Sequence, residues 1–133
     1  GMNFRNGSPP SHEIKKEILS QGKEFAASNG GQILLTNQPH EAAKNADIVY
    51  TDVWTSMGQE AEAEKRRLAF SGYQVDDKLL SLAEEDTLFM HPLPAHQGEE
   101  ISIGLLDSPR SVVFDQAENR LHLQEALLAK ILQ

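Results

Sequence analysis

The stretch "QILLTNQPHEAAKNADIVYTD" (residues 32–52) decides the fold class, because it has the pattern of a strand, a short helix and a second strand. Both "QILLT" (32–36) and "DIVYTD" (47–52) are short, apolar and rich in β-branched residues, as buried strands are. Pro39 is suited to the first position of a helix, which we expect to run through Ala46. Strand–helix–strand units build mainly parallel sheets, so the stretch predicts an α/β fold.

The same rules applied outward extend this alternation over most of the chain. We expect Ser11 to cap the first helix, Gly30 and Gly31 to end it, and Asp76 to cap a later one. The fold expected is a three-layer α/β domain, Rossmann-like, with a mainly parallel sheet flanked by helices. The further elements predicted are helices over 12–28, 59–70, 76–85 and 117–133, and strands over 87–91 and 111–115.

Length and composition favour one domain and exclude several classes of protein. The chain has 133 residues, which suits a single core, and we expect it to span 11–133. Residues 1–10 are expected to be an irregular lead-in that begins with an expression-tag remnant, Gly1, followed by an initiator methionine, Met2. No cysteine, no apolar run of membrane-spanning length and no secretory signal are present, which favours a cytoplasmic protein without membrane contacts. The net charge of −8 argues against a nucleic-acid partner.

Three loops rich in polar residues follow predicted strands. They are "DVWTSMG" (52–58), "HPLPAHQGEE" (91–100) and "DQAENR" (115–120). Ligands of open α/β sheets bind beyond the carboxyl ends of the strands, where such loops gather. The sequence therefore predicts that the three loops share one edge of the sheet and form the ligand site.

The first loop carries residues suited to a charged ligand. Asp52 at a strand end favours an ammonium group, or it only caps the following turn. Ser56, Met57 and Gly58 offer a hydroxyl and backbone N–H groups to an anionic group just before a helix N-terminus. Trp54 either packs in the core or forms a wall of the site.

The second loop is expected to be stiff and to bind no metal. His91 and His96 lie five residues apart, which is not a zinc-site spacing, and no cysteine completes a ligand set. Pro92 and Pro94 restrict the backbone on both sides of Leu93 and fix the direction of its carbonyl and side chain. A cis peptide bond between Leu93 and Pro94 fits such a pocket-shaping loop.

Arg120 is the cation of the third loop. Its guanidinium could clamp a phosphate or a carboxylate, or it could form a surface pair with Glu118 or Glu125. The glycine-rich nucleotide motifs and the common hydrolase and zinc-protease motifs are missing from the sequence. A generic dinucleotide-binding domain is therefore disfavoured.

The segments "DVWTSMGQEAE" (52–62), "FMHPLPAHQGEEI" (89–101) and "SVVFDQAENRLHLQEALLAKIL" (111–132), in this order, resemble the ornithine carbamoyltransferase family. The resemblance is to its second, ornithine-binding domain and runs from about Gly31 to the C-terminus. It implies transfer of a carbamoyl group from carbamoyl phosphate to the δ-amine of ornithine, a step of arginine biosynthesis that gives citrulline and needs no metal or organic cofactor. We expect the chain to form a homo-oligomer.

By position, the resemblance assigns substrate binding to Asp52, Ser56, Met57 and Leu93. Asp52 resembles the aspartate that holds the ornithine ammonium and amine groups. Ser56 and Met57 match the mobile "SMG" loop around the amino-acid end of ornithine.

The resemblance assigns the reacting centre to His91, Pro92, Leu93 and Arg120. The first three match the family's "HCLP" segment, and Arg120 matches the arginine of "ENR" that contacts carbamoyl phosphate. Pro92 departs from the family, which usually has cysteine there, whereas "HPLP" is typical of aspartate carbamoyltransferases. The departure puts the identity of the substrate in question.

Two family motifs do not occur in the sequence: the "S-T-R-T-R" carbamoyl-phosphate loop and the "D-G-N-N" turn. The chain is thus expected to be a truncated domain, incomplete at its N-terminus, of roughly two-fifths of a family enzyme. We expect it to need a carbamoyl-phosphate-binding domain, supplied by a separate chain, for activity. The alternative is a non-catalytic remnant or interaction module that self-associates through Leu123, Leu127 and Ile131.

Overall fold

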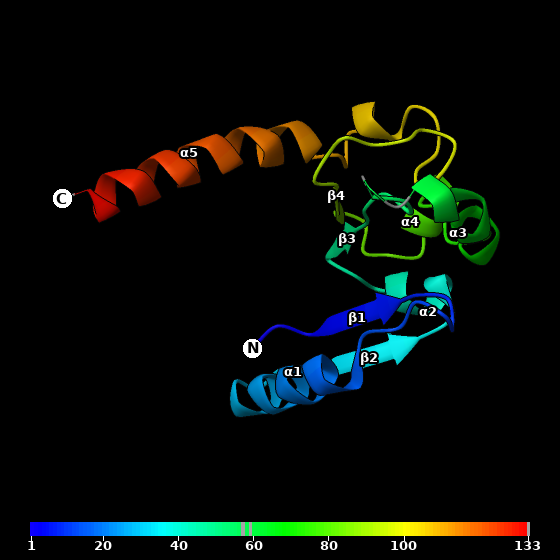
Figure 1. The fold of residues 1–133 in the computed structure, drawn as a ribbon, viewed down its shortest axis with the longest axis horizontal. Helices are drawn as coiled ribbons and strands as arrows, with labels where there is room; N and C mark the ends of the chain where they lie inside the picture. Colours follow the sequence, from blue (N-terminus) through cyan, green and yellow to red (C-terminus); the bar gives the residue numbers. More distant parts are fainter. Residues whose placement is uncertain (57, 59, 133) are drawn as a thin grey trace.

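The computed structural model describes residues 1–56, 58 and 60–132. Short strands alternate with helices along the chain (Figure 1). The strands are β1 (Phe4–Gly7), β2 (Ile33–Thr36), β3 (Ile48–Tyr50) and β4 (Leu88–Met90). The helices are α1 (Lys16–Ser28), α2 (Pro39–Ala43), α3 (Ala63–Ala69), α4 (Asp77–Leu80) and α5 (Val113–Ile131), with 3₁₀ turns at Glu60–Glu62 and Leu105–Asp107.

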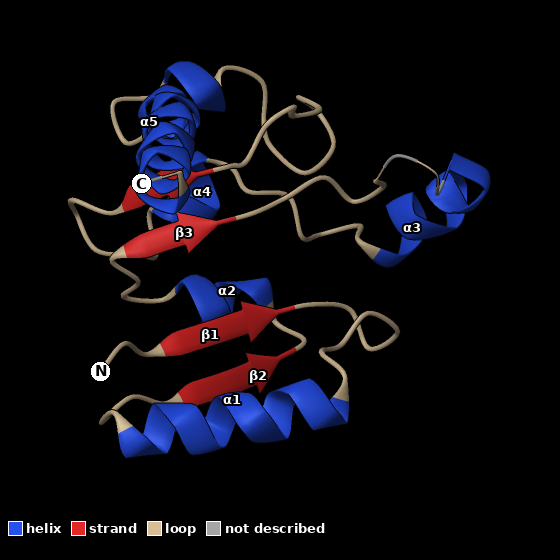
Figure 2. Ribbon diagram, turned by 60° about the vertical axis from the view of Figure 1, so that its left-hand side comes forward, coloured by secondary structure: helices blue, strands red, loops and turns tan. Residues whose placement is uncertain are grey.

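The strands pair in parallel, which confirms the α/β class. β1 pairs with β2 and β3 pairs with β4, and helices flank both pairs (Figure 2). Within the described residues these are two separate two-stranded sheets rather than one continuous sheet. Helix α2 contacts β1, β2 and α4, and the Arg5 guanidinium donates to the Lys44 carbonyl oxygen. Helix and side-chain contacts therefore join the two pairs.

Two expected elements differ from the structure. The segment expected to be an irregular lead-in contains β1, because Phe4 N–H donates to Gln32 O (2.8 Å) and the strand then follows β2. The strand expected over 111–115 is wrong: only Ser111 bridges Phe89, and α5 begins at Val113. In both segments, contacts with distant parts of the chain determine the secondary structure and override the preference of the local sequence.

The predicted helix ends are partly confirmed. Helix α1 begins later than expected, and Ser11 does not cap it: its Oγ lies 2.9 Å from His12 Nδ1. The glycine stop is confirmed, because Gly30 has φ +68° and Gly31 N–H donates to Ala26 O (2.8 Å). Asp76 caps α4 as predicted.

The hydrophobic core lies around β4 and α4. Phe89 and Leu80 are fully buried there, together with two polar residues, His91 and Glu100. Helix α5, by contrast, extends away from the rest of the molecule (Figure 1) and buries only Val113 among its residues. None of the helices in the described part of the chain has both the length and the apolar composition for crossing a membrane. The buried core residues are Ala43, Val49, Val75, Leu79, Leu80, Phe89, Ile101, Leu105 and Val113.

Candidate functional site

The loops after β3 and β4 begin side by side. Tyr50 pairs with Met90 at the last position of the ladder, and Thr51 N–H donates to Met90 O (3.3 Å). Asp52 and His91 thus follow paired strand ends directly. The prediction that these two loops share an edge is confirmed.

The start of α5 completes this edge. Val112 N–H donates to Phe89 O (3.0 Å), and the Gln116 side chain accepts a hydrogen bond from His91 N–H (3.0 Å). Arg120 is one helical turn beyond Gln116, about 6 Å along the axis and on the same face. The third predicted loop therefore meets the second, although it lies in a helix rather than after a strand.

The Arg120 guanidinium is exposed and makes no hydrogen bond or ion pair with any described residue. The surface pair considered from the sequence does not form, and the two acids lie near His122 instead. Its Nε2 is 3.8 Å from Glu118 and its Nδ1 is 3.9 Å from Glu125. Arg120 is therefore available to an anionic group.

The first loop presents Asp52 at the surface. The Asp52 carboxylate accepts one hydrogen bond, from Val53 N–H (2.7 Å), so it supports the turn as the simpler alternative expects. It has no other partner among the described residues, which leaves one oxygen for a cation. Ser56 is exposed, and Met57 lies outside the described residues.

Trp54 takes neither role considered from the sequence, because it is half-buried outside the core and lines a cavity away from the predicted site. It stacks on Phe70 at 5.9 Å, and it also lines a cavity of about 500 Å³ with Arg67 and Gln74. This cavity is distinct from the edge at the strand ends, since its lining includes neither Asp52 nor Leu93. The predicted site is an open edge of the molecule and does not coincide with this cavity.

The second loop is held by its own side chains. His91 is fully buried, and its Nδ1 accepts a hydrogen bond from Leu93 N–H (2.9 Å). Leu93 has φ +52°, and the Leu93–Pro94 peptide bond is cis, as predicted. Pro92 and Leu93 are half-buried. The loop therefore presents the Leu93 backbone in a fixed direction.

Glu100 is the functional candidate that the sequence analysis missed. Its carboxylate is fully buried and lies 3.3 Å from His91 Nε2, and it accepts a hydrogen bond from His96 N–H (2.5 Å). Gly98, at φ +92°, turns the chain back toward His91. The signal in the sequence was an acid after a glycine turn, which gives no indication of burial.

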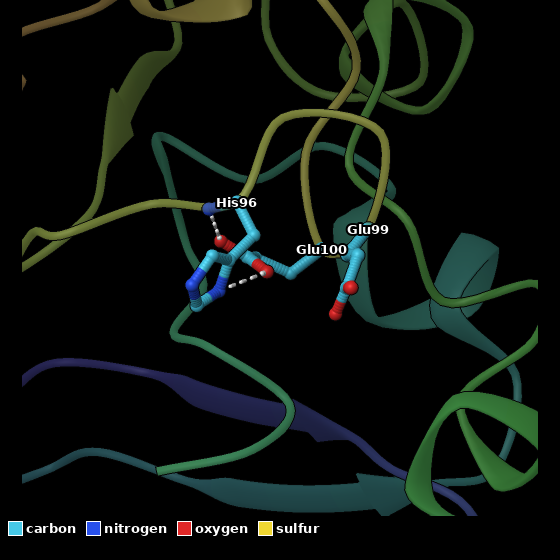
Figure 3. Close-up of side chains that lie close together, drawn as sticks. All are labelled: His96, Glu99 and Glu100. Carbon is cyan, nitrogen blue, oxygen red and sulfur yellow. Dashed lines mark hydrogen bonds and ion pairs between the residues drawn. The ribbon is translucent and has the colours of Figure 1, made fainter. Parts of the chain in front are cut away.

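His96, Glu99 and Glu100 form a cluster whose nitrogen and oxygen atoms lie within 4.8 Å of one another (Figure 3). Glu99 is already paired, because Arg67 Nε donates to it (3.0 Å) and this hydrogen bond raises the Arg67 pKa. We therefore interpret the cluster as a network of ion pairs and hydrogen bonds.

Comparisons with known proteins identify the family to which this chain is similar. The sequence model of "Aspartate/ornithine carbamoyltransferase, Asp/Orn binding domain" matches residues 1–131. The ornithine carbamoyltransferase of Anoxybacillus flavithermus is 48% identical over 132 residues, 99% of this chain and 42% of that protein. The anabolic ornithine carbamoyltransferase of Pyrococcus furiosus is 50% identical over 125 residues, 94% of this chain and 40% of that protein.

Solved structures show the same relationship. The ornithine carbamoyltransferase from Pyrococcus furiosus superposes with a TM-score of 0.89 at 49% identity, covering 97% of this chain and 41% of that one. The anabolic enzyme of Campylobacter jejuni gives 0.90 at 35% identity, covering 96% and 42%. This chain thus spans less than half the length of these relatives. It belongs to the aspartate/ornithine carbamoyltransferase family, of which it represents the Asp/Orn binding domain.

Proposed function

We propose that this chain is the ornithine-binding part of an ornithine carbamoyltransferase. The observation that carries the proposal is the junction of the β3 and β4 ends, where Asp52 is exposed beside the stiff His91–Leu93 loop. The Asp52 carboxylate would bind the ammonium group and the Leu93 carbonyl would orient the δ-amine. Ser56 and Met57 would contact the amino-acid end. The relatives named above are ornithine carbamoyltransferases, which supports this substrate class.

The proposed reaction requires alignment of the amine with the carbamoyl group and cations near the departing phosphate. The δ-amine attacks the carbamoyl carbon, and the departing phosphate is stabilised by positive groups. At this edge the chain offers Arg120, one turn from Gln116, as a free cation. We propose that a carbamoyl-phosphate-binding domain supplies the remaining cations, that the chain is inactive without it, and that both act in the cytoplasm.

Pro92 bears on the choice of amino acid. Proline has no N–H group and no thiol, so this position can neither donate a hydrogen bond nor place sulfur near the amine. The Asp52 carboxylate favours a substrate with a second ammonium group and disfavours a dicarboxylic acid. We propose that Asp52 outweighs Pro92 and that ornithine is preferred over aspartate.

Calorimetric titration with ornithine, norvaline and aspartate tests this preference. We expect ornithine to bind, and its affinity to fall by roughly tenfold in Asp52→Asn, because the charge-assisted bond is lost. Asp86→Asn, on the chain before β4, is the matched control. Citrulline should form only when the carbamoyl-phosphate domain of a relative is added. Tighter binding of aspartate, or no citrulline in any mixture, would contradict the proposal.

A second candidate function is self-association without catalysis. The exposed apolar side chains of α5 favour it, since Leu123, Leu127 and Ile131 are each more than half exposed. Light scattering over a range of concentrations tests it. Growth of a dimer together with failure to bind ornithine would favour this function over the first, and a monomer at all concentrations would exclude it.

A further inference from the structure

We propose that Glu100 is a positioning residue, which fixes the Leu93 backbone through the buried imidazole of His91. The carboxylate lies 3.3 Å from His91 Nε2, and His91 Nδ1 accepts from Leu93 N–H (2.9 Å). The three groups form a chain from Glu100 to the residue proposed to orient the amine. The inference rests on the proposed function only for what Leu93 then does.

The hydrogen-bond directions define the state of the ring. Nδ1 accepts a hydrogen bond, so it carries a lone pair and the ring is neutral. The ring proton must then be on Nε2, which faces the Glu100 carboxylate. Glu100 therefore selects the tautomer in which Nδ1 can hold Leu93.

Burial makes this selection strong. Both side chains are fully buried, and a buried N–H without an acceptor is costly. Glu100 Oε1 lies 3.3 Å from Nε2, within ion-pair distance, but the contact lacks hydrogen-bond geometry and Nε2 has no hydrogen-bond partner among the described residues. Without this acceptor, the buried imidazole lowers its energy by turning or by moving its proton to Nδ1. Either change breaks the hydrogen bond from Leu93 N–H to Nδ1.

Glu100 is itself held from two sides. Its carboxylate accepts from His96 N–H (2.5 Å), and its backbone oxygen accepts from Val75 N–H (2.9 Å). The neighbouring Ile101 is fully buried. The acceptor for His91 is thus built into the core, whereas Leu93 lies at the edge.

Nuclear magnetic resonance of the folded chain tests the proposal without substrate. The nitrogen shifts of His91 should show the Nε2–H tautomer. In Glu100→Met, which keeps the length of the side chain and removes the acceptor, we expect the Leu93 amide to exchange roughly tenfold faster relative to the Phe89 amide. Glu100→Gln keeps an acceptor and should restore both signals, and Glu99→Gln is the matched control.

The outcomes separate this proposal from the proposed function. A wild-type ring protonated on Nδ1 or on both nitrogens would overturn it, as would unchanged Leu93 exchange in Glu100→Met. If that variant does not fold, the wild-type tautomer and the Glu100→Gln variant decide, and loss of Leu93 protection in the latter contradicts an acceptor role. If the signals respond as expected but ornithine does not bind wild type, the positioning role stands and the proposed function fails.

Discussion

The β4 loop and helix α5 follow one another in the chain but differ in how they are stabilised. His91 and Glu100 have no exposed surface, whereas α5 leaves Leu123 71% and Ile131 67% exposed. The loop finds its partners in its own side chains, as in the His91–Glu100 pair, and in Val75 and Gln116 from neighbouring elements. The helix finds almost none among the described residues. The comparison indicates that the β4 loop is packed within this chain, whereas α5 is left uncovered among the described residues.

A pair of phenylalanines gives the largest expected effect on this comparison. Phe89 in β4 is fully buried and Phe114 in α5 is 60% exposed. We expect Phe89→Ala to lower the free energy of unfolding by about 3–5 kcal/mol, because it leaves a cavity. Phe114→Ala should cost less than about 1 kcal/mol. Urea denaturation measures both, and equal losses would show that α5 is as well packed as the core.

Arg120→Gln tests whether the exposed helix contributes to chemistry. With a carbamoyl-phosphate domain added, we expect citrulline formation to fall by roughly a hundredfold, because a cation near the departing phosphate is lost. The urea midpoint should not change, since Arg120 has no partner among the described residues. Lys130→Gln, near the end of the same helix, is the control. Equal activity of the two variants would exclude Arg120 from the reaction.

Charged substitutions on α5 test whether the helix associates with a second copy. We expect Leu127→Glu to weaken association by at least tenfold, because a carboxylate would be buried in the contact. Gln124→Glu adds the same charge at a polar position and should have little effect. Sedimentation at several concentrations measures both. If Leu127→Glu associates as wild type does, another surface is responsible.

The smallest effect concerns Tyr73, whose ring lies edge-on to Phe70. Burial raises the pKa of Tyr73, so the folded state holds the phenolic proton more tightly than the unfolded state does. Stability from this group is complete below the unfolded pKa and is lost as the pH rises through the folded pKa. Tyr73→Phe should therefore flatten the alkaline decline of the unfolding free energy. An unchanged decline would assign it to other groups.

The sequence predicted those parts of the fold that local patterns determine. The unit from β2 through β3, the Asp76 cap and the Gly30 stop all depend on residues within a few positions of one another. Strand β1 did not show such a pattern, because it exists through pairing with β2 nearly thirty residues away. The helix start at Val113 depends on a single bridge to Phe89. The predictions for β1 and for the start of α5 failed because the sequence pattern carries no information on pairing between distant residues.

The candidate site divides in the same way. Asp52, His91 and Leu93 could be predicted because each follows a strand or lies between prolines. Glu100 could not, because an acid after a glycine is usually solvated and only the tertiary fold buries it against His91. The free state of Arg120 also required the structure, in which Glu118 and Glu125 lie near His122 instead.

Mapping ornithine by amide chemical shifts tests the central claim most directly. The account predicts that the largest shifts on titration fall on residues after β3 and β4, at Asp52, Val53 and Leu93, with Gln116 beside them. Shifts centred instead on the cavity beside Trp54, or no shifts at millimolar ornithine, would contradict the claim that these strand ends form the substrate site.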